Sequence, residues 1–78
     1  MTPQDFRTIG AALFGPSWQR ALASALGLNE RAVRHYAAQS NPREIPESMP
    51  QELARLLDAR AAHLRTLANM LRVKKGKL

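Results

Sequence analysis

The sequence predicts an all-α protein, a small helical bundle that ends in one long C-terminal helix. Apolar residues recur at helical spacing through most of the chain, and no stretch alternates with the period of two that marks a strand. Capping and stop residues divide the first 47 residues into short segments. The helical pattern of leucines and alanines after residue 50 then continues to about Arg72, which predicts a helix over residues 48–72, ~36 Å long.

Length and composition exclude several classes of protein. A chain of 78 residues is one small domain that buries only ~60% of its unfolded surface, so we expect support from a partner. The chain has no cysteine, and His35 and His63 are too far apart for a metal site by spacing alone. No apolar run approaches the ~20 residues of a membrane span, and the N-terminus lacks a signal-peptide pattern. Glu44 and Glu47 lie near no candidate base, so the sequence predicts no enzyme and no cofactor.

The charge is strongly basic and unevenly distributed. Twelve Lys and Arg residues stand against six Asp and Glu residues, for a formal net charge of +6 and a pI near 11.2. Residues 72–78 hold four of the cations, and we predict a basic flexible tail over residues 73–78. The balance favours a polyanionic partner. Because a basic tail is often just solvated, the evidence for such a partner must come from the middle of the chain.

Three short helices are predicted in residues 1–47. Thr2 as N-cap and Pro3 as the first helical residue begin one that ends near residue 14, before Gly15-Pro16. Mid-helix Gly10 suggests that another helix approaches closely at this point. Ser17 is the predicted N-cap of a second helix from Trp18 to about Leu26. Asn29 is the predicted cap of a third, from Glu30 to about Gln39.

Residues 17–39 have the pattern of a helix-turn-helix. A small residue, Ala23, allows the two helices to cross closely, and Gly27 tolerates the positive φ that the turn needs. Leu28 fills the turn, while Val33 and Tyr36 give the second helix a buried face.

The opposite face of this third helix is polar or small. Helical spacing places Arg31, Arg34, His35 and Ala38 on it together, away from Val33. Arginine donates two hydrogen bonds to guanine, and a small residue permits close approach to the bases. The sequence therefore predicts a helix that enters the major groove of DNA.

Residues 19–38 resemble the DNA-binding segment of the lambda-repressor-like, Cro/XRE-type regulators. The resemblance is carried by Gln19, Ala23, Gly27, Leu28, Val33 and Tyr36. It extends to the very small phage-type and anti-CRISPR-associated repressors, which share this size and plan. It implies that Gln19 contacts a DNA phosphate. We assign the same role to Ser17, Arg20 and Arg43, although Arg20 and Arg43 are equally interpretable as surface charges. The residues it implies for reading bases are Asn29, Glu30, Arg31, Arg34 and His35.

The long helix offers a surface for self-association. Its leucines fall on the a and d positions of a heptad that Arg60 interrupts, and the first turns suffice to close the core of the body. An exposed leucine stripe beyond them would promote aggregation unless it were paired, so we expect a two-fold homodimer. The predicted dimer contacts are Leu57, Leu64, Leu67 and Leu71.

The sequence thus predicts a cytoplasmic, nucleoid-associated bacterial regulator of transcription. Residues 1–47 would form the helix-turn-helix body, and residues 48–72 would close the core and join the protomers. Two reading helices ~34 Å apart would fit an inverted repeat in double-stranded DNA, and the small size favours an autorepressor without a small-molecule effector. Two alternatives remain open at this point: a protein-interaction module or antitoxin that uses the long helix, and an architectural protein with low DNA specificity.

Overall fold

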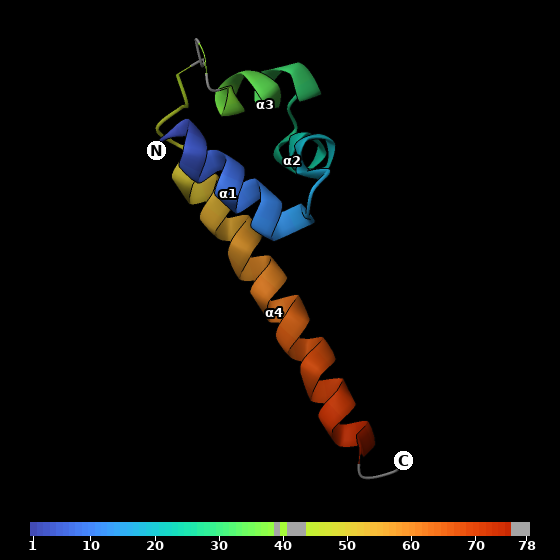
Figure 1. Cartoon of the computed structure of the whole chain (residues 1–78). Coiled ribbons are helices and arrows are strands. Elements are labelled where there is room, and N and C mark those ends of the chain that lie inside the picture. Colours follow the sequence, from blue (N-terminus) through green and yellow to red (C-terminus); the bar gives the residue numbers. More distant parts are fainter. Residues whose placement is uncertain (39, 41–43, 76–78) are drawn as a thin grey trace.

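The structure is a computed structural model that describes residues 1–38, 40 and 44–75. The described residues form four helices, α1 (Pro3–Phe14), α2 (Trp18–Leu26), α3 (Glu30–Ala37) and α4 (Met49–Lys75). The first three pack with the start of α4 into one body, and the rest of α4 projects from it as a single helix (Figure 1). We call residues 57–75 the stalk. The molecule measures 55 × 22 × 20 Å, and the predicted all-α bundle with a long C-terminal helix is confirmed.

Local hydrogen bonds explain where α1 begins and ends. The backbone N–H of Asp5 donates to the Thr2 hydroxyl at 3.0 Å, and the Thr2 N–H donates to the Asp5 carboxylate at 3.4 Å. This reciprocal pair is a capping box, which satisfies two donors that helix geometry leaves free. At the other end Gly15 adopts a φ of 80° and donates to the Ala11 carbonyl at 2.8 Å.

The turn between α2 and α3 depends on Gly27, whose φ of 71° lies in the left-handed region. The Leu28 N–H donates to the Ala23 carbonyl at 2.8 Å, and the Gly27 N–H donates to the Ser24 carbonyl at 3.3 Å. These two bonds form a Schellman motif, which ends α2 and satisfies its last carbonyls. Asn29 then begins α3, because its side-chain oxygen accepts a hydrogen bond from the Ala32 N–H at 2.8 Å. Three residues therefore separate the helices, a length typical of a helix-turn-helix.

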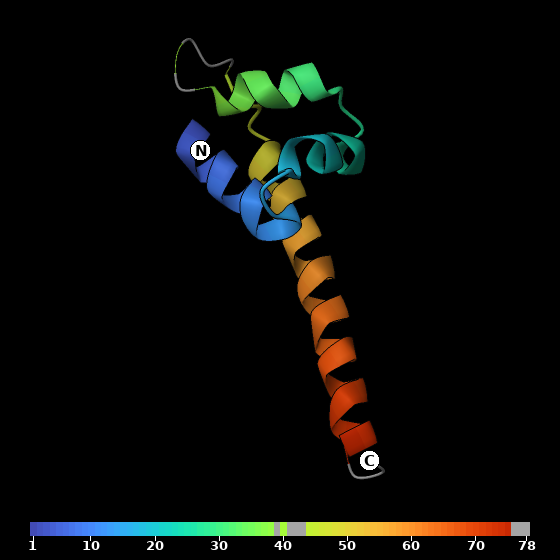
Figure 2. The same ribbon diagram turned by 45° about the vertical axis from the view of Figure 1, so that its right-hand side comes forward.

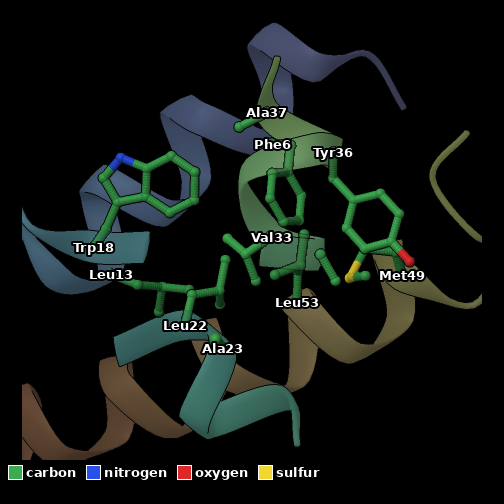
Figure 3. Packing of buried hydrophobic residues seen from close by; sticks show 11 residues of the cluster. Phe6, Leu13, Trp18, Leu22, Ala23, Val33, Tyr36, Ala37, Met49 and Leu53 are labelled. Atoms are coloured by element: carbon green, nitrogen blue, oxygen red, sulfur yellow. The ribbon is translucent and has the colours of Figure 1, made fainter. Parts of the chain in front are cut away.

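The hydrophobic core lies where α1, α2, α3 and the start of α4 meet (Figure 3). Phe6 is at its centre, with its ring edge-on to Trp18 at 5.7 Å and to Tyr36 at 5.9 Å between centroids. Such edge-to-face pairs add ~0.5–1.5 kcal/mol beyond the burial of their area. Met49 and Leu53 bring the first two turns of α4 into the same cluster. The other buried side chains are Leu13, Leu22, Ala23, Ala32, Val33 and Ala37.

Gly10 of α1 accommodates the Trp18 ring of α2, which agrees with the close approach that its place in the sequence suggested. A Cβ atom there would lie 2.7 Å from Cδ2 and 2.8 Å from Cζ3 of the Trp18 ring. We expect Gly10→Ala to lower the free energy of unfolding by about 1–3 kcal/mol, because overcrowding outweighs the ~1 kcal/mol gain in helix propensity. Urea unfolding followed by circular dichroism measures the change, and a more stable variant would contradict this packing.

Three local predictions need correction. Ser17 occupies the N-cap position of α2 but makes no side-chain capping bond, because its ψ of 43° is not the extended conformation that directs the hydroxyl to the helix. The third helix ends at Ala37, earlier than predicted, and Ala38 is extended. The predicted tail is helical over residues 73–75, where lysines suit both helix propensity and the negative end of the helix dipole. Residues 39 and 76–78 lie outside the described part.

Candidate nucleic-acid interface

The exposed side of α3 presents the predicted basic residues together. Arg31, Arg34 and His35 are all exposed, whereas Val33 is fully buried and Tyr36 is only 8% exposed on the other side. The alternation follows from helical spacing, which turns two of every four residues of this short helix toward the core. One outward surface of the body therefore carries two guanidinium groups and an imidazole.

The position of α3 in the molecule leaves this surface uncovered by the other residues that the structure describes. In both views α3 lies at the end of the body remote from the C-terminal end of α4 (Figures 1 and 2). Its buried side packs against α1 and α2. The exposed side is therefore turned away from the stalk, outward along the long dimension of the molecule.

A polar hollow between the N-terminal ends of α2 and α3 contains most of the predicted phosphate contacts. It has a volume of ≈ 370 Å³ and is lined by Pro16, Ser17, Gln19, Arg20 and Glu30. Ser17, Gln19 and Arg20 are thus brought together as the phosphate assignment requires. Glu30 lies with them, where its carboxylate favours the positive end of the α3 dipole. Arg43 lies outside the described residues.

Asn29 has a structural role in addition to the one predicted for it. Its side-chain oxygen accepts the Ala32 N–H and so fixes the first turn of α3. Only the amide NH₂ group of Asn29 is left to donate to a ligand. That donor is therefore the part of the side chain that the cap leaves wholly free for base reading.

Arg7 makes a contact that sequence reasoning missed. Its Nη1 donates to the carbonyl of Ala37, the last residue of α3, at 2.6 Å in a partly buried position. The bond joins α1 to the end of α3, where unpaired carbonyls carry partial negative charge. One signal was present: α3 has no glycine after it, so its terminal carbonyls need a donor from elsewhere in the chain.

We expect Arg7→Met to lower the free energy of unfolding by about 1.5–3 kcal/mol, the usual range for a hydrogen bond to a charged group. Arg7→Lys should retain part of this stability, since an ammonium group also donates to a carbonyl. The matched control is Arg20→Met, an exposed residue whose replacement should change stability by less than about 0.5 kcal/mol. Equal effects of the Met substitutions at positions 7 and 20 in urea unfolding would show that the Arg7 bond contributes nothing.

The stalk exposes apolar side chains that the body does not cover. Leu57, Leu64, Leu67 and Leu71 are 37, 51, 42 and 70% exposed, and helical spacing places them on one side of α4. A shallow groove lined by Thr66, Asn69, Met70 and Val73 lies on another side. Exposed apolar surface of this extent indicates a protein partner or self-association.

Other kinds of site find no support in the part of the chain that the structure describes. No three His, Asp or Glu side chains come together there as metal ligands would. None of the described helices combines the length and the apolar character needed to cross a membrane. The chain matches no family model, and comparison with the curated proteins and with the solved structures found no match either.

Proposed function

We propose that this protein is a transcriptional regulator that binds double-stranded DNA sequence-specifically through the exposed side of α3. The single observation that carries the proposal is the outward presentation of Arg31, Arg34 and His35 on a helix whose other side is held in the core. The tight three-residue turn after α2 supports it, because it fixes α3 rigidly on the body. The resemblance to the Cro/XRE-type regulators agrees with this arrangement.

The chemistry of the surface suits the major groove. The groove is ≈ 12 Å wide, enough for a helix, and an arginine pairs with O6 and N7 of guanine through two hydrogen bonds. The hollow with Ser17, Gln19 and Arg20 lies beside the N-terminal end of α3, where a phosphate would meet an arginine, an amide and a hydroxyl on one side and the Glu30 carboxylate on the lining as well. Base contacts from α3 and phosphate contacts from α2 would then fix the register of the body on the duplex.

We propose further that the protein acts as a homodimer joined through the stalk. The exposed leucines of the stalk need a partner, and a second copy supplies a matching stripe. The role as an autorepressor follows from the small size, because a DNA-bound dimer of this kind needs only to block polymerase. Reading an inverted repeat on one duplex would require both α3 surfaces to face the same DNA.

A second candidate is a protein-interaction module, such as an antitoxin, and the same exposed leucines favour it. In that case the stalk would bind a different protein and the basic side of α3 would be incidental. DNA binding distinguishes the two candidates, because only the regulator needs it.

Fluorescence anisotropy tests the proposed function directly. Protein is titrated into labelled DNA from upstream of its own gene and into a random duplex of equal length and composition at the same salt concentration. We expect nanomolar binding to the upstream DNA, tighter than to the random duplex by about 10³-fold or more. Equal affinities would indicate an architectural protein of low specificity, and no binding to either duplex would contradict the proposed function.

A further inference from the structure

We infer that two stalks pair antiparallel, so that the two α3 surfaces of a dimer point in opposite directions. The pairing is an inference about the stalk alone. Its consequence for DNA rests on the proposed function. Two observations favour this orientation: the position of Arg60 in the leucine stripe and the distribution of charge along α4. A third, the burial of Leu53, bears on the register.

Arg60 interrupts the leucine seam. Heptad spacing puts Leu57, Leu64 and Leu71 at a positions and Arg60, Leu67 and Lys74 at d positions. In a parallel pair equal positions meet, so Arg60 would face the partner's Arg60 within the seam. In an antiparallel pair each d position faces an a position, and Arg60 then meets the partner's Leu71. Its aliphatic stem covers that leucine while the guanidinium group reaches water at the edge.

The charges along α4 point the same way. From residue 60 onward the chain contains only cations among its Asp, Glu, Lys and Arg residues, six of them with three in residues 74–77. The carboxylates of this helix, Glu52 and Asp58, lie near its beginning. Parallel pairing brings two strongly basic ends together. Antiparallel pairing separates the two basic ends and brings each beside the beginning of the partner's α4, where residues 52–60 carry two acidic and two basic side chains, so the repulsion between the ends is removed.

The burial of Leu53 selects the register. With Leu64 opposite the partner's Leu67, the overlap covers residues 57–74, roughly 26 Å at 1.5 Å per residue. Moving the partner by one heptad toward the body would place its Leu71 opposite Leu53. Leu53 is only 1% exposed, because it is part of the body's own core. The first register therefore keeps all four stalk leucines inside the overlap. Leu64 and Leu67 then face leucines, and Leu57 and Leu71 face the partner's Lys74 and the partner's Arg60, residue types whose aliphatic stems cover apolar surface. It also places Ala61 beside the partner's Ala68, where small side chains permit close approach.

The two α3 surfaces would then lie at opposite ends of the dimer. Each is turned away from its own stalk, so the two face in opposite directions (Figures 1 and 2). Such a dimer binds two separate stretches of duplex, either two DNA molecules or two distant operators on one molecule joined by a loop. The inverted repeat on a single face of DNA, which the sequence predicted, needs the parallel pair instead.

Disulfide cross-linking determines the orientation, and the absence of cysteine from the chain leaves no background. Arg60→Cys and Leu71→Cys are each made in the full chain and oxidised alone and mixed, without DNA. We expect a disulfide-linked dimer mainly in the mixture. Self-linking of both single variants would show a parallel pair and overturn the inference. A mixture that stays unlinked, or a wild-type chain that sediments as a monomer, would overturn it as well.

A bridging experiment tests the consequence for DNA. Upstream DNA is immobilised, saturated with wild-type protein and then mixed with a fluorescent copy of the same duplex. We expect the fluorescent duplex to be retained by the wild-type protein and lost with Leu64→Lys/Leu67→Lys. Binding to the immobilised DNA without capture of the second duplex would overturn bridging and leave the proposed function standing. Absence of any DNA binding would refute the proposed function, while the cross-linking result would still stand for the stalk.

Discussion

Replacing Leu64 and Leu67 with lysine should convert the proposed dimer into a monomer with an intact body. Both side chains are about half exposed on the stalk and contribute nothing to the core of the body. Burying a leucine side chain contributes ~1.5–3 kcal/mol, and each substitution also introduces a charge at the seam of both copies. Loss of four such contacts per dimer should raise the dissociation constant by about 100-fold or more. Sedimentation equilibrium measures the change.

The control for this variant carries the same added charge on another side of the helix. Ala59→Lys/Ala62→Lys places two lysines away from the leucine stripe, at residues that are also exposed. This control should remain dimeric, and both variants should unfold at the same urea concentration as the wild type. On DNA with two binding sites the leucine variant should bind more weakly than the wild type. A dimer can hold both sites at once, and a monomer holds only one. Dimers that persist in the leucine variant would rule out the stalk interface.

Arg34→Ala should remove most of the discrimination at one base pair while the fold stays intact. Arg34 is exposed on α3, and a bidentate contact with guanine contributes about 1–3 kcal/mol of discrimination, or roughly 5- to 150-fold in relative affinity. The measurement is anisotropy on the upstream DNA and on variants in which each guanine is replaced in turn. For one of these DNA variants, the wild-type protein should bind more weakly than it binds the original duplex, whereas the Arg34→Ala protein should bind both duplexes equally.

The matched control is Arg65→Ala, which removes the same charge from the exposed stalk. It should lower affinity for all duplexes by a similar small factor, because a distant cation acts through the overall field of the protein. An identical preference of wild type and Arg34→Ala for every guanine variant would show that Arg34 reads no base.

The fold was predictable wherever local chemistry decides it. Thr2 and Pro3 set the start of α1, and Gly15 and Gly27 set the ends of α1 and α2 through their positive φ angles. Such caps act within a few residues, so the sequence alone reveals them. Ser17 shows the limit of this logic: it has the right type and position for a cap, yet its backbone conformation leaves the hydroxyl unused.

Features that depend on distant residues were harder to predict. Periodicity alone placed Val33 and Tyr36 in the core and Arg31 and Arg34 outside it. The bond between Arg7 and Ala37 joins residues 30 positions apart and leaves no periodic signal. Gly10 suggested that a helix comes close, but only the structure identifies the Trp18 ring as the group it accommodates.

Nuclear magnetic resonance on the isotopically labelled protein tests the central claim most directly. Upstream duplex is added stepwise and backbone and arginine side-chain signals are followed. The largest shifts should fall on residues 29–35, with smaller ones at residues 17–20 beside the polar hollow, and a random duplex should affect them less. Shifts centred on residues 57–73, with α3 unaffected, would contradict the role proposed for α3.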